Sequence, residues 1–145
     1  MGSASTEVAF DDYFHGGWFC IETAFSPTYH NFLNTLVAAA NIIAVSVDYR
    51  RAPEHTVPIA YDDSWTAVKW FSSHSNGSGN EDWLYSHVDF KQVFFAGDNA
   101  GANIAQNMGF RIGNEKLDCL NVSGIVLIHP YFWGNQLIGN ETEDV

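Results

Sequence analysis

Basic residues are scarce in this sequence of 145 residues. Six lysines and arginines face seventeen aspartates and glutamates, which gives a formal net charge of −11. Proteins that hold nucleic-acid phosphates usually present a basic surface, and this balance of charge does not supply one. We therefore expect neither DNA nor RNA as a partner.

Long apolar runs and cysteines are also few. No apolar run reaches the ~18–20 residues that a membrane-spanning helix needs, so we expect no membrane partner. The N-terminus has neither the basic start nor the apolar core of a secretory signal, which leads us to expect a cytoplasmic protein. The two cysteines, Cys20 and Cys119, are then predicted to be free thiols.

What the sequence does contain is an alternation of apolar stretches with amphipathic ones. Residues 41–49, 92–97 and 124–129 are typical of strands buried in a parallel sheet, and residues 13–14 end a further strand. Helices are predicted from Pro27, from near Pro58 and over about residues 100–112. The alternation predicts an α/β fold with a mostly parallel sheet of about four strands and helices on both faces.

Two glycine-containing motifs follow predicted strands, at the sheet edge where α/β proteins place their chemistry. His15-Gly16-Gly17-Trp18 resembles the oxyanion loop of lipases and esterases, although it also suits a tight turn. The segment 97–101 has the frame of a nucleophile elbow, formed by Gly97, Asp98 and Gly101 around Asn99. A generic strand-to-helix turn is the alternative for this second motif.

Together with three further segments these motifs resemble one family. Asp48-Tyr49-Arg50, Ala52-Pro53-Glu54-His55 and His129-Pro130-Tyr131-Phe132 stand in the order found in the hormone-sensitive-lipase branch of the α/β-hydrolases. Within that branch the chain is most similar to plant carboxylesterases, relatives of the gibberellin receptors. The resemblance implies a partial α/β-hydrolase fold with strand order 2-1-3-4 and no cofactor or metal. It also implies that His15, Asp48, Arg50 and Glu54 are structural residues near the site.

The chain departs from the family's pattern at the residues that perform catalysis. Asn99 stands where the resemblance requires a serine nucleophile, and a carboxamide cannot attack an ester. The family's acid and base residues would follow the point at which this sequence ends, and we assign His129 no catalytic role. Trp18 replaces a small residue, and its indole is expected to crowd the pocket or displace the loop. The candidate oxyanion hole consists of the backbone N–H groups around Gly16, Gly17, Trp18 and Ala100.

The N-terminal part also departs from the family's pattern. Acidic residues directly precede residues 13–14, which end the strand before the oxyanion loop. We interpret residues 1–12 as a remnant N-terminal segment and residues 13–145 as an incomplete α/β-hydrolase domain. The outer strands of such a sheet are predicted to be unprotected edges that favour self-association.

Three hypotheses follow for function. The first is a carboxylesterase-like protein of the kind that hydrolyses small carboxylic esters, which is catalytically inactive with the residues present in this sequence. The second is a binding module for a small ester or carboxylic acid, similar to the gibberellin receptors, with Trp18 and Phe19 as an apolar wall. The third is a truncated product without a function of its own.

Overall fold

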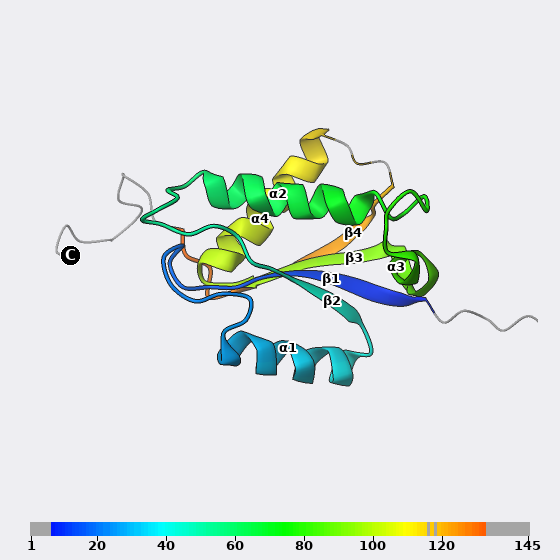
Figure 1. The fold of residues 1–145 in the computed structure, drawn as a ribbon, viewed down its shortest axis with the longest axis horizontal. Helices are drawn as coiled ribbons and strands as arrows, with labels where there is room; N and C mark the ends of the chain where they lie inside the picture. The colour runs from blue at the N-terminus through cyan, green and yellow to red at the C-terminus, as the bar shows by residue number, and fades with distance from the viewer. Residues whose placement is uncertain (1–6, 116, 118, 133–145) are drawn as a thin grey trace, which may run out of the picture.

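The computed structural model describes residues 7–115, 117 and 119–132. Strands and helices alternate along the chain, with one short helix inserted before the third strand (Figure 1). The elements are β1 (Val8–Phe14), α1 (Pro27–Ala40), β2 (Ile43–Val47), α2 (Ile59–Ser72), α3 (Asp82–His87), β3 (Val88–Asp98), α4 (Ala100–Glu115) and β4 (Val122–Ile128).

The strands form one four-stranded sheet in the order β2-β1-β3-β4, and every neighbouring pair is parallel. This confirms both the predicted fold class and the predicted strand order. Helix α1 lies on one face of the sheet, and α2 and α4 lie on the other (Figure 1). The carboxyl ends of β1 and β3 lie side by side, since Phe14 pairs with Gly97.

The predicted elements agree with the observed ones to within a few residues, with two exceptions. The helix α3 was not predicted, because its six residues are too few to show a helical period. The strand β1 begins at Val8, whereas only its end at residues 13–14 was predicted. Residues 8–12 therefore belong to the sheet, although their acidic side chains argue against a buried strand.

The two faces of the sheet differ in how they are covered. On the side of α2 and α4, Phe10 of β1 stacks on Phe71 of α2 with ring centroids 3.6 Å apart, within a large core. On the side of α1 the buried cluster is small and centres on Tyr13, Tyr29 and Leu33. Phe32, on the same helix, is 41% exposed. The helix α1 thus covers only part of its face.

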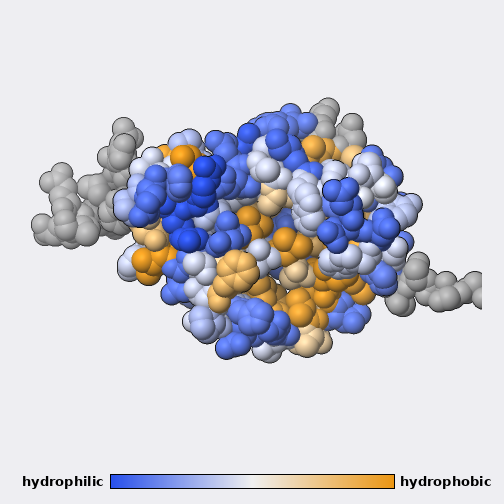
Figure 2. Space-filling model, viewed as in Figure 1, coloured by the Kyte–Doolittle hydropathy of each residue, from blue (hydrophilic) through white to orange (hydrophobic). Residues whose placement is uncertain are grey.

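The outer strand β2 is only partly covered. Ile43, Ala44 and Val45 all retain some exposure. Figure 2 shows apolar surface along this strand and the adjoining part of α1. Within the described residues, no helix combines the length and apolar character needed to cross a membrane.

Two carboxyl groups are buried in the middle of β1. Asp11 is 4% exposed and Asp12 is fully buried. Because side chains alternate along a strand, Asp11 faces α1 with Tyr13, and Asp12 faces α2 and α4 with Phe10 and Phe14. Neither carboxylate oxygen of Asp12, nor Oδ1 of Asp11, has a hydrogen-bond partner in the described part of the chain. Burial raises the pKa of Asp11 to about 7 and that of Asp12 well above its usual value.

Candidate functional site

A sharp turn joins β3 to α4 at Asn99. This residue has a φ of 54°, in the left-handed region that asparagine tolerates better than most residues. Its backbone N–H donates to the carbonyl of Ile128 at 2.9 Å, and its carbonyl accepts from the N–H of Tyr131 at 3.0 Å. The residues that end and follow β4 therefore hold this turn in place.

The turn leaves no room for side chains at the glycines around it. A Cβ at Gly97 would overlap the backbone of Gly101, and a Cβ at Gly101 would overlap the carbonyl group of Phe14. A Cβ at Gly16 would lie 2.6 Å from the hydroxyl oxygen of Tyr29. These three glycines allow β1, β3 and α4 to approach one another at the carboxyl edge of the sheet. The segment 97–101 thus has the geometry of a nucleophile elbow.

The loop after β1 turns back toward the elbow. Gly17 has a φ of 105°, Trp18 a φ of 53° and Phe19 a φ of 63°, so three successive residues adopt left-handed conformations. The backbone N–H of Trp18 donates to Oδ1 of Asn99 at 3.0 Å. Trp18 is one of the predicted oxyanion-hole donors, and the side chain at the nucleophile position occupies it. Sequence reasoning missed this contact, although a carboxamide oxygen is a good hydrogen-bond acceptor.

The indole of Trp18 was expected to crowd the pocket or to displace the loop. It is 62% exposed, so the ring extends mainly toward solvent while the residue still borders the site. Phe19, by contrast, is buried against Tyr49 and Tyr61 in the main core. The prediction that Phe19 and Trp18 together form an apolar wall for a ligand is therefore wrong for Phe19.

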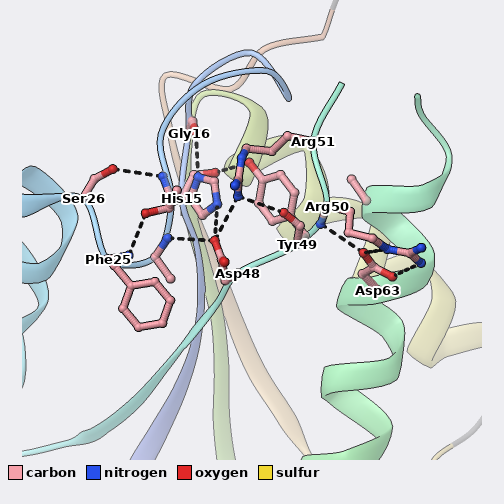
Figure 3. A network of polar contacts seen from close by, with 12 residues as sticks. His15, Gly16, Phe25, Ser26, Asp48, Tyr49, Arg50, Arg51 and Asp63 are labelled. Atoms are coloured by element: carbon pink, nitrogen blue, oxygen red, sulfur yellow. Dashed lines mark hydrogen bonds and ion pairs between the residues drawn. The ribbon is translucent and has the colours of Figure 1, made fainter. Parts of the chain in front are cut away.

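His15 is fully buried below this loop and supports it (Figure 3). Its ring stacks on Tyr49 with centroids 4.2 Å apart, and the Tyr49 hydroxyl donates to the His15 carbonyl at 2.7 Å. Its Nδ1 lies 2.8 Å from the Gly16 carbonyl oxygen, and its Nε2 lies 3.8 Å from Oδ1 of Asp48. Burial lowers the pKa of His15 below its usual value, which favours a neutral ring.

Polar contacts tie the segment after β2 to its surroundings (Figure 3). Asp48 accepts hydrogen bonds from the Ala24 N–H at 3.2 Å and from Arg51 at 3.0 Å. The Arg50 guanidinium donates to both carboxylate oxygens of Asp63, at 2.7 and 2.8 Å, and holds the pKa of that carboxyl below its usual value. Asp48 and Arg50 therefore anchor backbone next to the site without entering it.

Glu54 does not take part in this set of contacts. It is exposed, and no hydrogen bond joins it to another of the described residues. Its predicted structural role near the site has no contact to support it.

A shallow cavity of about 280 Å³, wide open to solvent, lies beside the elbow. Trp18, Ile21 and Asn99 lie on its walls, and two carboxylates, Asp98 and Glu22, contribute as well. The Tyr29 hydroxyl donates to Oδ2 of Asp98 at 2.8 Å, which orients that side chain. A second hollow of about 310 Å³ shares Tyr29 and Asp98 and extends to His129.

This constellation has the elbow and the oxyanion loop of an esterase site in their relative places. An elbow follows a central strand, a glycine loop faces it, and a backbone donor points at the residue on the elbow. A family model described as "alpha/beta hydrolase fold" matches residues 13–144. The chain belongs to this α/β-hydrolase family.

Individual relatives agree with that family. The chain is 56% identical over 148 residues to "Probable carboxylesterase 13" of Arabidopsis thaliana, covering 98% of this chain and 45% of the relative. It is 50% identical over 133 residues to "2-hydroxyisoflavanone dehydratase" of Glycine max, covering 89% and 42%. Both relatives are plant proteins, which confirms the resemblance to plant carboxylesterases. The chain spans less than half the length of these relatives.

Two solved structures share the fold of this chain. An esterase from the archaeon Pyrobaculum calidifontis superposes with a TM-score of 0.72 at 31% identity, covering 88% of this chain and 38% of the esterase. "Structure of arylesterase" superposes with a TM-score of 0.75 at 23% identity, covering 93% and 40%. This second likeness shows the fold alone.

Proposed function

We propose that this chain is a carboxylesterase-like α/β-hydrolase that does not hydrolyse esters. The observation that carries the proposal is the hydrogen bond from the Trp18 N–H to Oδ1 of Asn99. The Asn99 side chain therefore has two effects. It takes the place of the nucleophile, and it accepts the hydrogen bond of a backbone donor that would otherwise stabilise the oxyanion.

The chemical reason lies in what acyl transfer requires. A serine or cysteine attacks the ester carbonyl because a base can remove its proton, whereas the carboxamide nitrogen has its lone pair delocalised into the carbonyl. Backbone donors then stabilise the oxyanion, and losing one such donor costs hydrolases about 2.7–4 kcal/mol. Asn99 makes both steps unfavourable at the same place.

Initial-rate measurements with p-nitrophenyl acetate test this proposal. We expect the protein and its Asn99→Ala variant to match the rate in buffer, because neither carries a nucleophile at the elbow. Near-UV circular dichroism of both proteins checks that they are folded. Saturable hydrolysis by the protein that disappears in Asn99→Ala would overturn the proposal.

We propose small-ligand binding as the second candidate function, and the cavity beside the elbow supports it. Its volume of about 280 Å³ suits a small ester, and Asp98 and Glu22 on its walls repel an anion. These carboxylates favour a neutral ester over the ionised carboxylic ligand that the resemblance to gibberellin receptors suggests.

Calorimetric titrations with methyl phenylacetate and with the phenylacetate ion separate these ligands. The ester should bind at least about tenfold more tightly, a difference of about 1.4 kcal/mol. Equal binding, or tighter binding of the ion, would contradict the argument from charge. Absence of heat with both ligands at millimolar concentration would remove binding at this cavity as a function.

A further inference from the structure

Two hollows share a wall at the carboxyl edge of the sheet. The cavity beside the elbow and the hollow that extends to His129 are both lined by Tyr29 and Asp98. Oδ2 of Asp98 accepts the hydrogen bond of the Tyr29 hydroxyl, whereas Oδ1 accepts none from the described residues. Asp98 is half-buried, so a ligand in the cavity beside the elbow can reach its carboxylate.

A second carboxylate, Glu22, faces the same space. Backbone hydrogen bonds to the Gly17 carbonyl close the loop after β1, and Glu22 lies on the wall of the cavity beside the elbow. Burial, the hydrogen bond to Asp98 and the charge of Glu22 raise the pKa of Tyr29 to about 12, so both carboxylates lie near one phenol. Among the described residues, no lysine or arginine lines either hollow. The walls therefore favour a cation.

Tyr13 is an independent indication that this wall binds a ligand. Its side chain is 2% exposed and lies on the wall of the hollow that contains Asp98. No hydrogen bond within the described residues involves its hydroxyl, which borders the hollow and is not sealed in the core. Burial and the nearby charge of Asp98 raise the pKa of Tyr13, so the phenol stays protonated. A buried hydroxyl without a partner is costly, and a polar group of a ligand relieves that cost.

We propose that the site binds a small ligand with an ammonium group, which lies between Asp98 and Glu22, and with one ring, which lies in the hollow beside Phe32. This proposal rests on small-ligand binding at the elbow, the second candidate function. The ammonium group donates to the carboxylates and to the Tyr13 hydroxyl oxygen. The exposed indole of Trp18 on the same wall attracts a cation as well.

Calorimetric titrations with 2-phenylethylammonium, methyl phenylacetate and the phenylacetate ion test the proposal. The three probes share a benzyl group, so differences between them report the polar group. The ammonium compound should bind at least about tenfold more tightly than the ester, and phenylacetate should bind most weakly. The difference between the ammonium compound and the ester should shrink at high salt, because salt screens the carboxylates.

Three substitutions separate a local charge from the net charge. Asp98→Asn keeps an oxygen that accepts the Tyr29 hydrogen bond, and should weaken binding of the ammonium compound about tenfold while the ester changes less than about twofold. Glu22→Gln, at a more exposed position, should weaken it about threefold. Asp82→Asn is the matched control, since this exposed residue of α3 lines neither hollow. Its effect should stay within about twofold.

NMR of the unchanged protein locates the site without relying on a variant that folds. The indole N–H signal of Trp18 should shift during titration with 2-phenylethylammonium. The signal of Trp83, which is 48% exposed on α3, should not shift. Shifts of Trp83 without shifts of Trp18 would overturn the proposed place of binding.

Further outcomes would also overturn the proposal. If the ester binds as tightly as the ammonium compound, the preference for a cation is wrong, although small-ligand binding itself stands. Equal losses in Asp98→Asn and Asp82→Asn would show an effect of net charge alone. Absence of binding by all three probes would remove both this inference and the second candidate function.

Discussion

The two halves of β1 contrast sharply within one strand. Its carboxyl end, from Phe14 into the Gly16 loop, packs so closely against β3 and α4 that single methyl groups would not fit. Its middle contains Asp11 and Asp12, buried with carboxylate oxygens that lack partners. The site's scaffold is therefore retained in detail, whereas the strand that supports it carries unfavourable charges. The geometry of the elbow depends on backbone contacts more than on the quality of the core beneath it.

The largest expected effect on stability comes from adding a side-chain atom at the closely packed carboxyl end of β1. Gly101→Ala places a Cβ on the carbonyl of Phe14, so β1 or α4 must move. We expect a loss of more than about 4 kcal/mol in the free energy of unfolding, measured by urea titration. Gly113→Ala in the same helix is the control, because nothing lies within 4 Å of its added Cβ. It should gain up to about 1 kcal/mol. Similar effects for both variants would contradict the difference in packing.

The second prediction concerns the dependence of stability on pH, which the middle of β1 should dominate. The pKa of Asp11 is about 7 in the folded protein against an ordinary value of 3.8, so the folded state retains a proton that the unfolded chain releases. Its contribution to stability is complete below pH 3.8, is lost as pH rises toward 7, and is constant above that. The slope is about 1.4 kcal/mol per pH unit for one carboxyl.

Urea titrations from pH 4 to pH 7 measure this slope. The lowered pKa values of Asp63 and His15 act in the opposite direction. Asp63 belongs to a more exposed ion pair, and His15 offsets at most one of the two carboxyls whose pKa values are raised. The double variant Asp11→Asn with Asp12→Asn should lose most of the decline. A protein whose stability rises with pH over this range would contradict the assignment of buried, unpartnered carboxyls.

The third prediction removes one of these charges. Asp12→Leu replaces a fully buried carboxyl with a somewhat larger apolar side chain of the same branched shape, on the face of β1 that also carries Phe10 and Phe14. We expect the free energy of unfolding to increase by roughly 3 kcal/mol at pH 7. Asp82→Leu, at an exposed position, serves as the control and should change stability little. A destabilised Asp12→Leu variant would show that the carboxyl has a partner after all.

The smallest effect is expected at the edge of the sheet. We propose that β4 is an unprotected edge that promotes self-association, because none of its seven residues is charged and Leu127 is 38% exposed. Leu127→Lys should weaken association about tenfold, a change of about 1.4 kcal/mol, in sedimentation equilibrium. Lys91→Ala, which removes an exposed charge near the start of the neighbouring strand, should not weaken it. Monomers at all concentrations would contradict the edge argument.

Much of the fold could be predicted because strong local signals agree with it. The alternation of strands and helices, and Pro27 at a helix start, are sequence patterns that tertiary contacts did not override. The beginning of β1 could not be predicted, since Asp11 and Asp12 oppose burial and only pairing with β2 and β3 places them in the sheet. The sheet order itself required the family resemblance.

The candidate site also has features that the sequence predicts and features that it does not. Asn99 and the glycines around it are recognisable because an elbow requires a fixed frame of small residues. The contact between Trp18 and Asn99 could not be predicted, because it joins residues 81 positions apart and depends on how the loop turns at Gly17. Glu54 was misplaced because a motif gives sequence neighbours and not side-chain contacts.

Hydrogen exchange of the Trp18 backbone amide, followed by NMR, tests most directly whether Asn99 occupies the oxyanion donor. The amide should exchange at least about fivefold faster in Asn99→Ala than in the unchanged protein, as the loss of one hydrogen bond of about 1 kcal/mol implies. The Ala24 amide, which donates to Asp48, should exchange at the same rate in both proteins. Equal exchange of Trp18 in the two proteins would contradict the account.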